Sequence, residues 1–256
     1  TGGGEQVLAA NVDRVWIVHG LDMPVNSRRL ERYLAVVWDS GATPEVILTK
    51  GDLAEDMDAM VSQAKLTAVG ATVRCVSSKT AETVQDLRDS LAAGCTVSLL
   101  GPSGVGKSTL VNLLAGETLA ATGEVRAGDR KGRHTTVRRE LFRIPGGALL
   151  LDTPGMRELR VGVLDEGWKE AFPDIEELAH GCRFRDCRHE GEPDCAVQGA
   201  LATGALDPER LGSFQKLRAE VAYETRKTDP RARAAAVSEW KTAMKTLKHH
   251  AKYKDR

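Results

Sequence analysis

A glycine-rich segment holds the residues with the clearest chemistry. Residues 101–109 read Gly-Pro-Ser-Gly-Val-Gly-Lys-Ser-Thr and fit the Gly-x-x-x-x-Gly-Lys-Ser/Thr pattern of a P-loop. Its glycines let backbone N–H groups turn toward phosphate oxygens at a helix N-terminus, where the helix dipole favours anions. We expect Lys107 to reach the β- and γ-phosphates and Ser108 to bind Mg²⁺. The alternative is a glycine-rich turn without a ligand. The predicted phosphate-binding residues are Gly101, Pro102, Ser103, Gly104, Val105, Gly106, Lys107, Ser108 and Thr109.

A second segment predicts that the bound purine is guanine. Thr49-Lys50-Gly51-Asp52 follows an apolar stretch and is similar to the Asn-Lys-x-Asp motif of GTPases. The Asp52 carboxylate would accept hydrogen bonds from guanine N1–H and N2–H₂, whereas adenine would leave it unpaired. Lys50 would lay its stem along the base. Thr49 stands where an Asn amide usually ties loops together, so we expect weaker affinity without altered base choice. The predicted base-contacting residues are Thr49, Lys50, Gly51 and Asp52, with Ser77, Ser78 and Lys79, a loop resembling the Ser-Ala-Lys loop whose N–H meets guanine O6.

Two further segments resemble the switches that sense the third phosphate. Asp152-Thr153-Pro154-Gly155 follows three leucines, and we expect Asp152 to hold Mg²⁺ through water and the Gly155 N–H to sense the γ-phosphate. The loop from Gly132 to Thr136 occupies the other switch position. Either Thr135 or Thr136 would complete the magnesium shell, and the sequence leaves this choice open.

Catalysis needs a group that orients the attacking water. In Ras-like enzymes this group is a Gln just after the Asp-x-x-Gly turn, but Met156 stands there and cannot polarise water. His134 is the best internal candidate, because a neutral imidazole can orient or deprotonate water near pH 7. The alternative is an exposed His that contacts RNA or nothing. The predicted catalytic residues are therefore His134, Lys107 and Gly155, with slow turnover until a partner orders the loop.

A compact group of thiols and one imidazole predicts a metal site. Cys182, Cys187, His189 and Cys195 fall within fourteen residues, which is the spacing of a metal site in a reducing compartment. Three thiolates and one imidazole complete a tetrahedral Zn²⁺ shell and leave no open position, so we expect a structural zinc ion. Free buried thiols are the alternative.

The order of the motifs indicates a circularly permuted GTPase. Apolar runs alternate with amphipathic stretches, which predicts an α/β fold with a mostly parallel sheet and helices on both faces. The guanine motifs precede the P-loop, whereas ordinary GTPases run in the opposite order, and the permuted chain leaves the domain directly after the second switch. Strands are expected at 14–19, 45–49, 72–76, 96–100, 140–144 and 148–151, and helices at 27–39, 53–69, 80–93 and 107–115.

We divide the chain into three parts. Residues 1–13 are an entry linker, 14–160 the GTPase domain and 161–256 a zinc-binding, mainly helical domain with a basic tail. Asp207-Pro208 would begin a helix to about Lys227, Asp229-Pro230 would interrupt it, and Ser238 could cap a last helix.

Composition narrows the class of protein. Of the 256 residues, 41% are apolar and 28% are charged, which is typical of a globular protein, and the net charge is zero. The sequence contains no run of 18 apolar residues that could span a membrane, and we find no secretion signal in it. From residue 226 to the end, ten Lys/Arg face three Asp/Glu, and a basic tail of this kind indicates a polyanionic partner, with a solvated helix as the alternative.

These features together resemble the RsgA (YjeQ) family of circularly permuted GTPases that depend on the small ribosomal subunit. The similarity covers nearly the whole chain, from the Ala9-Ala10-Asn11-Val12-Asp13 entry through Gly-Arg-His-Thr-Thr to the Cys-x-Phe-Arg-Asp-Cys-x-His-x-x-Glu-Pro-x-Cys segment and the tail. It implies a cytoplasmic monomer without membrane contact that hydrolyses GTP to GDP late in assembly of the 30S subunit, bound to its rRNA. The family's N-terminal OB-fold, an RNA-binding barrel, has no room before Arg14. Either the chain is a fragment or the protein lacks this domain.

Two other functions compete with this interpretation. One is a nucleotide-gated zinc and RNA-binding module in which hydrolysis is incidental, and stimulated turnover separates it from a GTPase. The other is a P-loop ATPase or small-molecule kinase. Asp52 argues against that second function.

Overall fold

The fold is built around one mixed sheet. The structure, a computed structural model, describes residues 10–117, 140–152, 164, 167–238, 241 and 244, and of Asp152 only the backbone. Within these residues the six strands have the order β3-β2-β1-β4-β6-β5, and only β5 runs antiparallel to its neighbour. The strands are β1 (Arg14–Gly20), β2 (Thr43–Thr49), β3 (Thr72–Cys75), β4 (Thr96–Leu100), β5 (Glu140–Arg143) and β6 (Leu149–Asp152).

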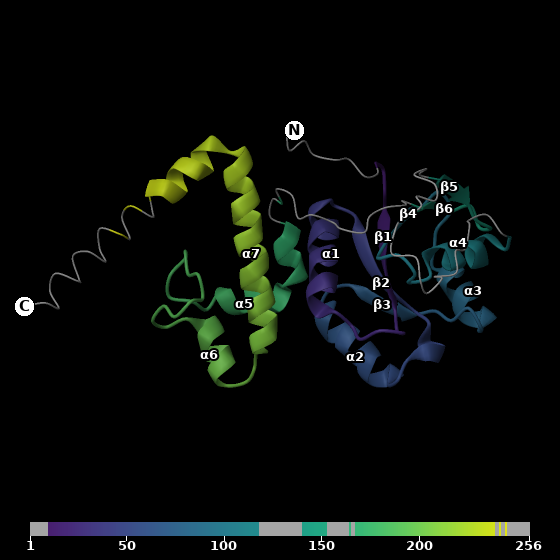
Figure 1. Ribbon diagram of the computed structural model, residues 1–256, viewed down its shortest axis with the longest axis horizontal. Helices are drawn as coiled ribbons and strands as arrows, with labels where there is room; N and C mark the ends of the chain where they lie inside the picture. The colour runs from purple at the N-terminus through teal and green to yellow at the C-terminus, as the bar shows by residue number, and fades with distance from the viewer. Residues whose placement is uncertain are drawn as a thin grey trace, which may run out of the picture.

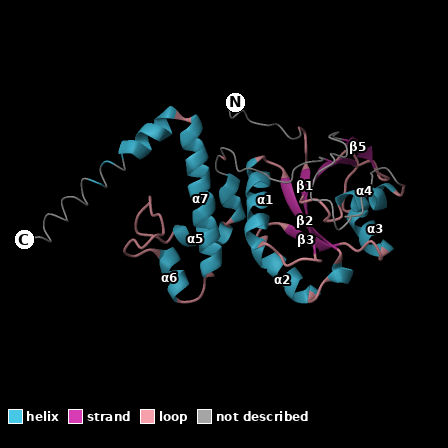
Figure 2. Ribbon diagram, viewed as in Figure 1, coloured by secondary structure: helices cyan, strands magenta, loops and turns pink. Residues whose placement is uncertain are grey.

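Helices cover both faces of this sheet, as Figure 2 shows. Residues of α1 (Ser27–Asp39) and α2 (Met57–Thr67) share one apolar cluster with Ile17 of β1. Residues of α3 (Ala81–Asp89) and α4 (Lys107–Ala115) share the other with Trp16. Successive side chains of a strand point to opposite faces, so apolar runs on the central strands supply both clusters at once. The predicted α/β class with a mostly parallel sheet is confirmed.

Local caps explain where the helices begin and end. The predicted bounds of α1 and α4 are confirmed, with the Asn26 side chain accepting a hydrogen bond from the Arg29 N–H at 2.9 Å. The second helix was expected from Leu53, but it begins at Met57, because Gly51–Leu53 form a 3₁₀ turn (η1) and Asp56 caps the helix through the Ala59 N–H.

The C-terminal elements pack directly on the nucleotide-binding half. They comprise η2 (Gly167–Ala171), α5 (Pro173–Ala179), α6 (Ala196–Ala202) and α7 (Pro208–Thr228). Figure 1 shows α7 beside α1, with α5 and α6 on its outer side. Gly167 lies against α1 so closely that a Cβ there would come within 2.4 Å of the Asp39 backbone. One apolar cluster includes Leu34 of α1 and Phe172 and Phe214 of the C-terminal elements, so both parts share a core. The domain boundary expected near residue 160 lies outside the described residues and stays a prediction.

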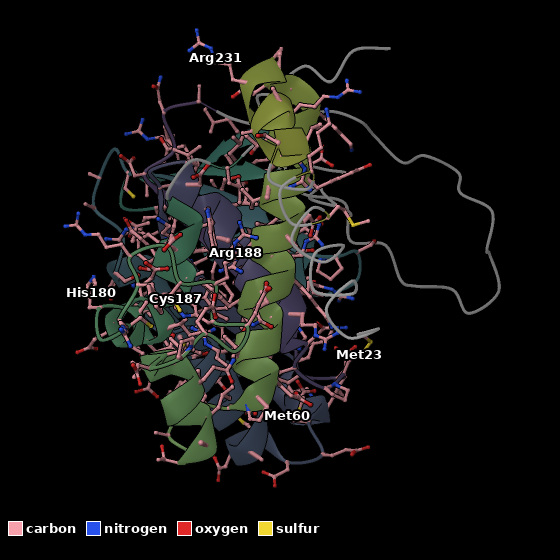
Figure 3. All side chains as sticks on the ribbon, turned by 90° about the vertical axis from the view of Figure 1, so that its left-hand side faces the viewer. Met23, Met60, His180, Cys187, Arg188 and Arg231 are labelled. Atoms are coloured by element: carbon pink, nitrogen blue, oxygen red, sulfur yellow. The ribbon has the colours of Figure 1, made fainter. Side chains whose placement is uncertain are left out.

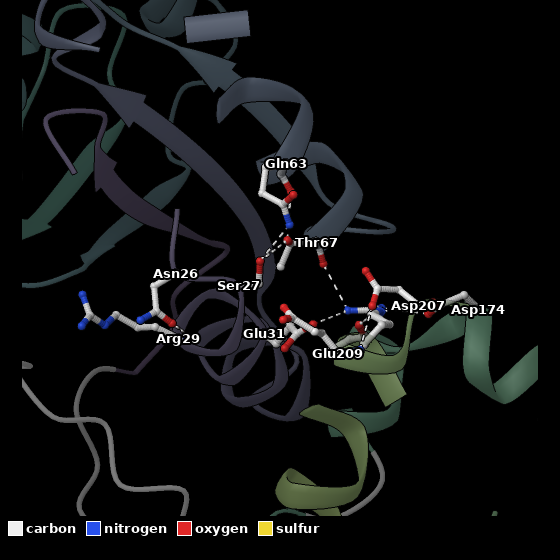
Figure 4. Close-up of polar contacts among 11 residues, drawn as sticks. Asn26, Ser27, Arg29, Glu31, Gln63, Thr67, Asp174, Asp207 and Glu209 are labelled. Atoms are coloured by element: carbon white, nitrogen blue, oxygen red, sulfur yellow. Dashed lines mark hydrogen bonds and ion pairs between the residues drawn. The ribbon is translucent and has the colours of Figure 1, made fainter. Parts of the chain in front are cut away.

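A buried arginine of α7 joins the two halves where Glu31 of α1, Thr67 of α2 and Asp174 of α5, labelled in Figure 4, come together. Arg210 of α7 is 9% exposed, and its guanidinium lies 2.9 Å from Glu31 of α1 and 2.8 Å from Asp174 of α5. The same group donates to the carbonyl oxygens of Ala171 and Thr67, and it lies 4.4 Å from the ring centroid of Phe172. Burial raises the pKa of Glu31, and the bond to Arg210 opposes that shift.

The chain bends sharply after α7. Asp229 ends the helix, and its carboxylate accepts a hydrogen bond from the Arg231 N–H at 2.8 Å, so a second helical stretch starts at Pro230. The expectation that Ser238 caps the last helix is wrong, because Asp229 supplies the cap and Ser238 lies inside the helical stretch. Among the described residues, none of the helices combines the length and the apolar composition needed to cross a membrane.

Candidate nucleotide site and metal centre

The expected nucleotide-binding loops lie at one edge of the sheet. In the parallel register, Thr49 at the end of β2 pairs with Gly20 of β1, Cys75 pairs with Leu48, and Leu100 pairs with Ile17. Parallel strands end at the same edge, which is where open α/β sheets bind ligands. The permuted chain therefore brings the segments near residues 49, 77 and 101 to a common edge.

The glycine-rich loop wraps the start of α4. Gly101 has φ +149°, and a Cβ there would come within 2.5 Å of the Val18 carbonyl oxygen, so only glycine fits. Gly106 precedes the helix with φ +99°, in the left-handed region. The Lys107 ammonium folds over the loop and donates to the carbonyl oxygens of Gly101 and Pro102, both at 2.7 Å. This arrangement could receive phosphate oxygens at the helix N-terminus with a cation alongside.

Thr49 joins the base-reading loop to the P-loop. Its buried hydroxyl donates to the Val105 carbonyl oxygen at 2.6 Å, and the His19 carbonyl oxygen is farther away, at 3.3 Å. We expected a single hydroxyl to be a weak substitute for the usual amide. It nevertheless connects the two loops directly, because β2 ends close enough to Gly106 for one short side chain to reach.

Ion pairs arrange the polar side chains around the expected base. The Asp52 carboxylate lies 2.7 Å from the Lys79 ammonium, and this hydrogen bond holds the pKa of Asp52 below its ordinary value. The Lys50 ammonium lies 2.7 Å from Asp22, and Lys50 itself has φ +57°. The predicted residues Asp52 and Lys79 thus meet across two loops. Asp22 is a partner that the sequence pattern did not single out.

A short turn holds the third expected loop. The Ser77 N–H donates to the Thr83 hydroxyl at 3.1 Å, and the Ser77 hydroxyl accepts from the Lys79 N–H at 3.2 Å. Ser78 lies between them in this turn, and Gly51 opens η1 beside Asp52.

Several predicted residues lie outside the described part of the chain. These are Thr153, Pro154, Gly155 and Met156 after β6, and the loop with His134, Thr135 and Thr136. For Asp152 the backbone ends β6 opposite Leu99 of β4, which puts it at the same sheet edge as Gly101.

The four predicted metal ligands form one cluster. The ligand atoms of Cys182, Cys187, His189 and Cys195 all lie within 4.8 Å of one another. The sulfur atoms of Cys182 and Cys195 are 3.8 Å apart, and His189 Nδ1 lies 3.6 Å and 3.5 Å from them. Zinc–sulfur bonds of about 2.3 Å and zinc–nitrogen bonds of about 2.0–2.1 Å in a tetrahedron require separations of about 3.8 Å and 3.5 Å. Cys182, His189 and Cys195 therefore have the separations of zinc ligands, and Cys187 lies close to all three.

The surroundings of His189 favour the form of the imidazole that binds a metal. His189 is buried, and burial followed by the charge of Arg218 lowers its pKa, which favours the neutral imidazole that a metal needs. The His189 carbonyl oxygen accepts hydrogen bonds from Gln198 at 2.5 Å and Gln215 at 3.1 Å. Figure 3 shows Cys187 among the loops beside α7 and His180 farther out, where it is exposed.

The Glu192 carboxylate shapes the loop between the ligands. It accepts the backbone N–H groups of Arg188 and Glu190 at 2.7 Å and 2.8 Å, and these bonds lower its pKa to about 2. Glu192 was part of the predicted motif, but the sequence pattern indicated no role for it. The only sign that it shapes the metal-binding loop was its position three residues before the predicted ligand Cys195.

Comparison of the sequence with those of known proteins finds similarity to one family of GTPases. The model of the RsgA GTPase family matches residues 1–162. The Small ribosomal subunit biogenesis GTPase RsgA 1 of Listeria innocua is 44% identical over 97% of this chain and 72% of its own length. The Small ribosomal subunit biogenesis GTPase RsgA of Opitutus terrae is 47% identical over 93% of this chain and 65% of its own length.

Solved structures share the fold. YjeQ from Thermotoga maritima superposes with a TM-score of 0.61 at 26% identity, covering 82% of this chain and 72% of that one. YloQ, described as a circularly permuted GTPase, gives a TM-score of 0.61 at 29% identity, covering 82% and 68%.

Proposed function

This chain belongs to the RsgA GTPase family and is a GTP hydrolase, and on that premise we propose that it acts in biogenesis of the small ribosomal subunit. The support for this role is the function that gives their name to relatives 44–47% identical over more than nine tenths of the chain. The structural observation that best supports nucleotide binding is that the Thr49–Asp52 loop and the P-loop lie at one edge of the sheet. The Thr49 hydroxyl joins the two loops by a hydrogen bond.

We assign the phosphates to residues 101–109 and the base to the loops near Asp52 and Ser78. Lys107 lies over the loop at hydrogen-bond distance from its carbonyl oxygens, and a phosphate would take over these contacts. Ser108 lies half-buried in the first turn of α4, where it could hold Mg²⁺ together with Asp152 and either Thr135 or Thr136. The magnesium ion would neutralise charge on the β- and γ-phosphates.

The guanine specificity rests on Asp52. Lys79 keeps this carboxylate ionised, so it can accept from guanine N1–H and N2–H₂. A base without those donors would leave the carboxylate unpaired, which costs binding free energy. Lys50, held by Asp22, would support the plane of the base.

We further propose that His134 orients the attacking water and that the Gly155 N–H senses the γ-phosphate. The support for His134 comes from the sequence alone. Met156 stands where Ras-like enzymes have a Gln, and a Met cannot polarise water, so another group must orient it. Binding to the ribosomal particle would order the loop and stimulate hydrolysis, which makes the particle a switch for the enzyme.

The proposed partners are the 30S particle and its rRNA. We propose that the protein binds them in the cytoplasm as a monomer. The basic segment from residue 226 onward supports a polyanionic partner. The four-ligand cluster could hold one Zn²⁺, which would fix the loops around α6 and leave no open position for a substrate.

One experiment tests the proposed function directly. GTP hydrolysis is measured with the full chain alone, with small ribosomal subunits and with large subunits as the control. We expect a slow rate alone and a faster rate only with small subunits. An unchanged rate in all three would overturn the role in small-subunit biogenesis, and competition by GDP but not ADP for a fluorescent GTP analogue tests base choice separately.

A further inference from the structure

A groove at the bend after α7 has the composition of a nucleotide-binding surface. It encloses about 490 Å³ and is lined by Tyr223, Arg226, Lys227, Arg233, Ala236 and Val237. This volume falls in the range of about 300–1,000 Å³ that small-ligand sites occupy. Figure 1 shows α7 turning into a short helical stretch, and Arg233, Ala236 and Val237 of that stretch line the groove.

The floor of the groove is aromatic and open to solvent. Tyr223 is 54% exposed and Val237 is 46% exposed, and both are large apolar side chains. The Lys227 ammonium lies 4.3 Å from the centroid of the Tyr223 ring and 2.7 Å from the Glu224 carboxylate. Because the ammonium lies over one face of this exposed ring, the other face is the one that offers a stacking surface, with positive charge close by.

The walls of the groove are cationic. Arg226, Lys227 and Arg233 line it, and among the described residues no carboxylate does. The bend brings Arg233 opposite the last turn of α7, because Asp229 ends one helix and caps the next. A ligand that fits must therefore combine a flat apolar ring with an anionic group a few ångströms away.

We propose that this groove binds an unpaired RNA nucleotide, with its base stacked on Tyr223 and its phosphate held by Arg226 and Arg233. A base in a duplex is already stacked and paired, so single-stranded RNA is the form that fits. This inference rests on the proposed function, since it names the part of the chain that would hold rRNA. Stacking on an aromatic ring tolerates any sequence, so the site would select for an unpaired strand rather than for one base.

The test measures binding of the full chain to an unstructured ten-nucleotide RNA that carries 2-aminopurine, a base whose fluorescence falls when it stacks. Affinity comes from fluorescence anisotropy at fixed salt. We expect Tyr223→Ala to weaken binding about tenfold, the size of one base–aromatic stack, and to abolish the quenching, whereas Tyr223→Phe keeps both. A blunt RNA duplex should bind without dependence on Tyr223.

A matched pair of arginine variants separates the groove from general basic charge. Arg231 lies on the same helical stretch as Arg233 but does not line the groove, and Figure 3 shows it projecting at the bend. Arg233→Ala should weaken RNA binding more than Arg231→Ala, although each removes one cation. Equal losses for the two variants, wild-type affinity of Tyr223→Ala or displacement of the RNA by an acidic peptide would each overturn the proposal.

These outcomes can be told apart from failure of the proposed function. GTP affinity of every variant is measured first, and it should match the wild type because the end of α7 and α4, which follows the P-loop, lie on opposite sides of the structure in Figure 1. If small subunits stimulate the wild-type GTPase while Tyr223→Ala binds the oligonucleotide normally, only the groove proposal fails. If small subunits do not stimulate the wild type, the proposed function fails whatever the oligonucleotide does.

Discussion

The Thr49 hydroxyl donates a 2.6 Å hydrogen bond to the Val105 carbonyl oxygen and so links the loop that reads the base to the loop that holds phosphate. The bond is buried, and it spans 56 residues of sequence. Its loss would leave a buried carbonyl oxygen without this partner and would free the two loops to move independently.

Thr49→Val should therefore weaken GTP and GDP binding by about 1–3 kcal/mol, the cost of an unsatisfied buried polar group. Thr49→Ser keeps the hydroxyl and should bind close to the wild type. Affinities are measured by titration with fluorescent nucleotides. The control is Thr225→Val, which removes a similar bond to the Val221 carbonyl oxygen on α7 and should not alter nucleotide affinity. Equal affinities for the Thr49 and Thr225 variants would contradict this role.

Asp52→Asn should weaken GTP binding by about 1–3 kcal/mol and shift preference toward xanthine nucleotides, because an amide donates where guanine also donates. The matched control is Asp58→Asn in the first turn of α2, an exposed carboxylate outside the predicted base-contacting residues. Competition assays with GTP and XTP decide the result. Unaltered GTP affinity in the Asp52 variant would remove this residue from the site.

The pH dependence of base choice follows from the same ion pair. The Lys79 ammonium lowers the pKa of Asp52, so the carboxylate is present at every pH above its lowered pKa and is lost only below the ordinary range of an Asp. Preference for GDP over ADP should stay constant from pH 8 to pH 5. A preference that declines between pH 7 and pH 5 would show that another group controls base choice.

Metal removal should affect the C-terminal elements more than the nucleotide site. We expect elemental analysis to find about one zinc ion per reduced chain, as four ligands in a closed tetrahedron require. Chelation should raise hydrogen exchange in α5 and α6 and leave GTP affinity close to that of the untreated protein. Cys187→Ser should reproduce this effect, whereas His180→Ala, an exposed residue outside the cluster, should not. A reduced chain without stoichiometric zinc would end this interpretation.

Arg210→Met should destabilise the chain by about 3–5 kcal/mol, because it leaves the buried carboxylate of Glu31 without its charge partner. Arg32→Met is the matched control. Arg32 also pairs α1 with α7, through Glu220 at 2.7 Å, but the two side chains are 38% and 35% exposed. An exposed pair of this kind contributes about 0–1 kcal/mol, so the control should unfold near the wild-type denaturant concentration. Similar losses for both variants would contradict the special role of the buried pair.

Local signals in the sequence predicted most of the nucleotide-binding half. The bounds expected for α1 and α4 match the structure, in which Asn26 caps one helix and Gly106 and Gly116 flank the other. The hairpin of β5 and β6 follows from Pro145-Gly146-Gly147, because Gly146 and Gly147 have positive φ. Metal spacing within fourteen residues is equally local.

Contacts between distant segments could not be predicted in this way. The pairing of Arg210 with Glu31 spans 179 residues, and an arginine in an amphipathic helix gives no sign that it will be buried. The same holds for Asp22 and Lys50, and for the hydroxyl of Thr49, whose reach depends on how closely β2 approaches the P-loop.

The strand order has a consequence for how the chain assembles during synthesis. Of the six described strands, β1 is made first, and it takes a central place in the sheet, between β2 and a strand, β4, that begins 82 residues after it in sequence. Domains fold from the N-terminus as they leave the ribosome, so β1, β2 and β3 can pair while the P-loop is still unmade. The nascent chain therefore contains the loops that bind the base before the P-loop, which binds the phosphates, has been synthesised. Stalled chains of increasing length should acquire GTP binding only once β4 and α4 have emerged, and binding by shorter chains would contradict this order.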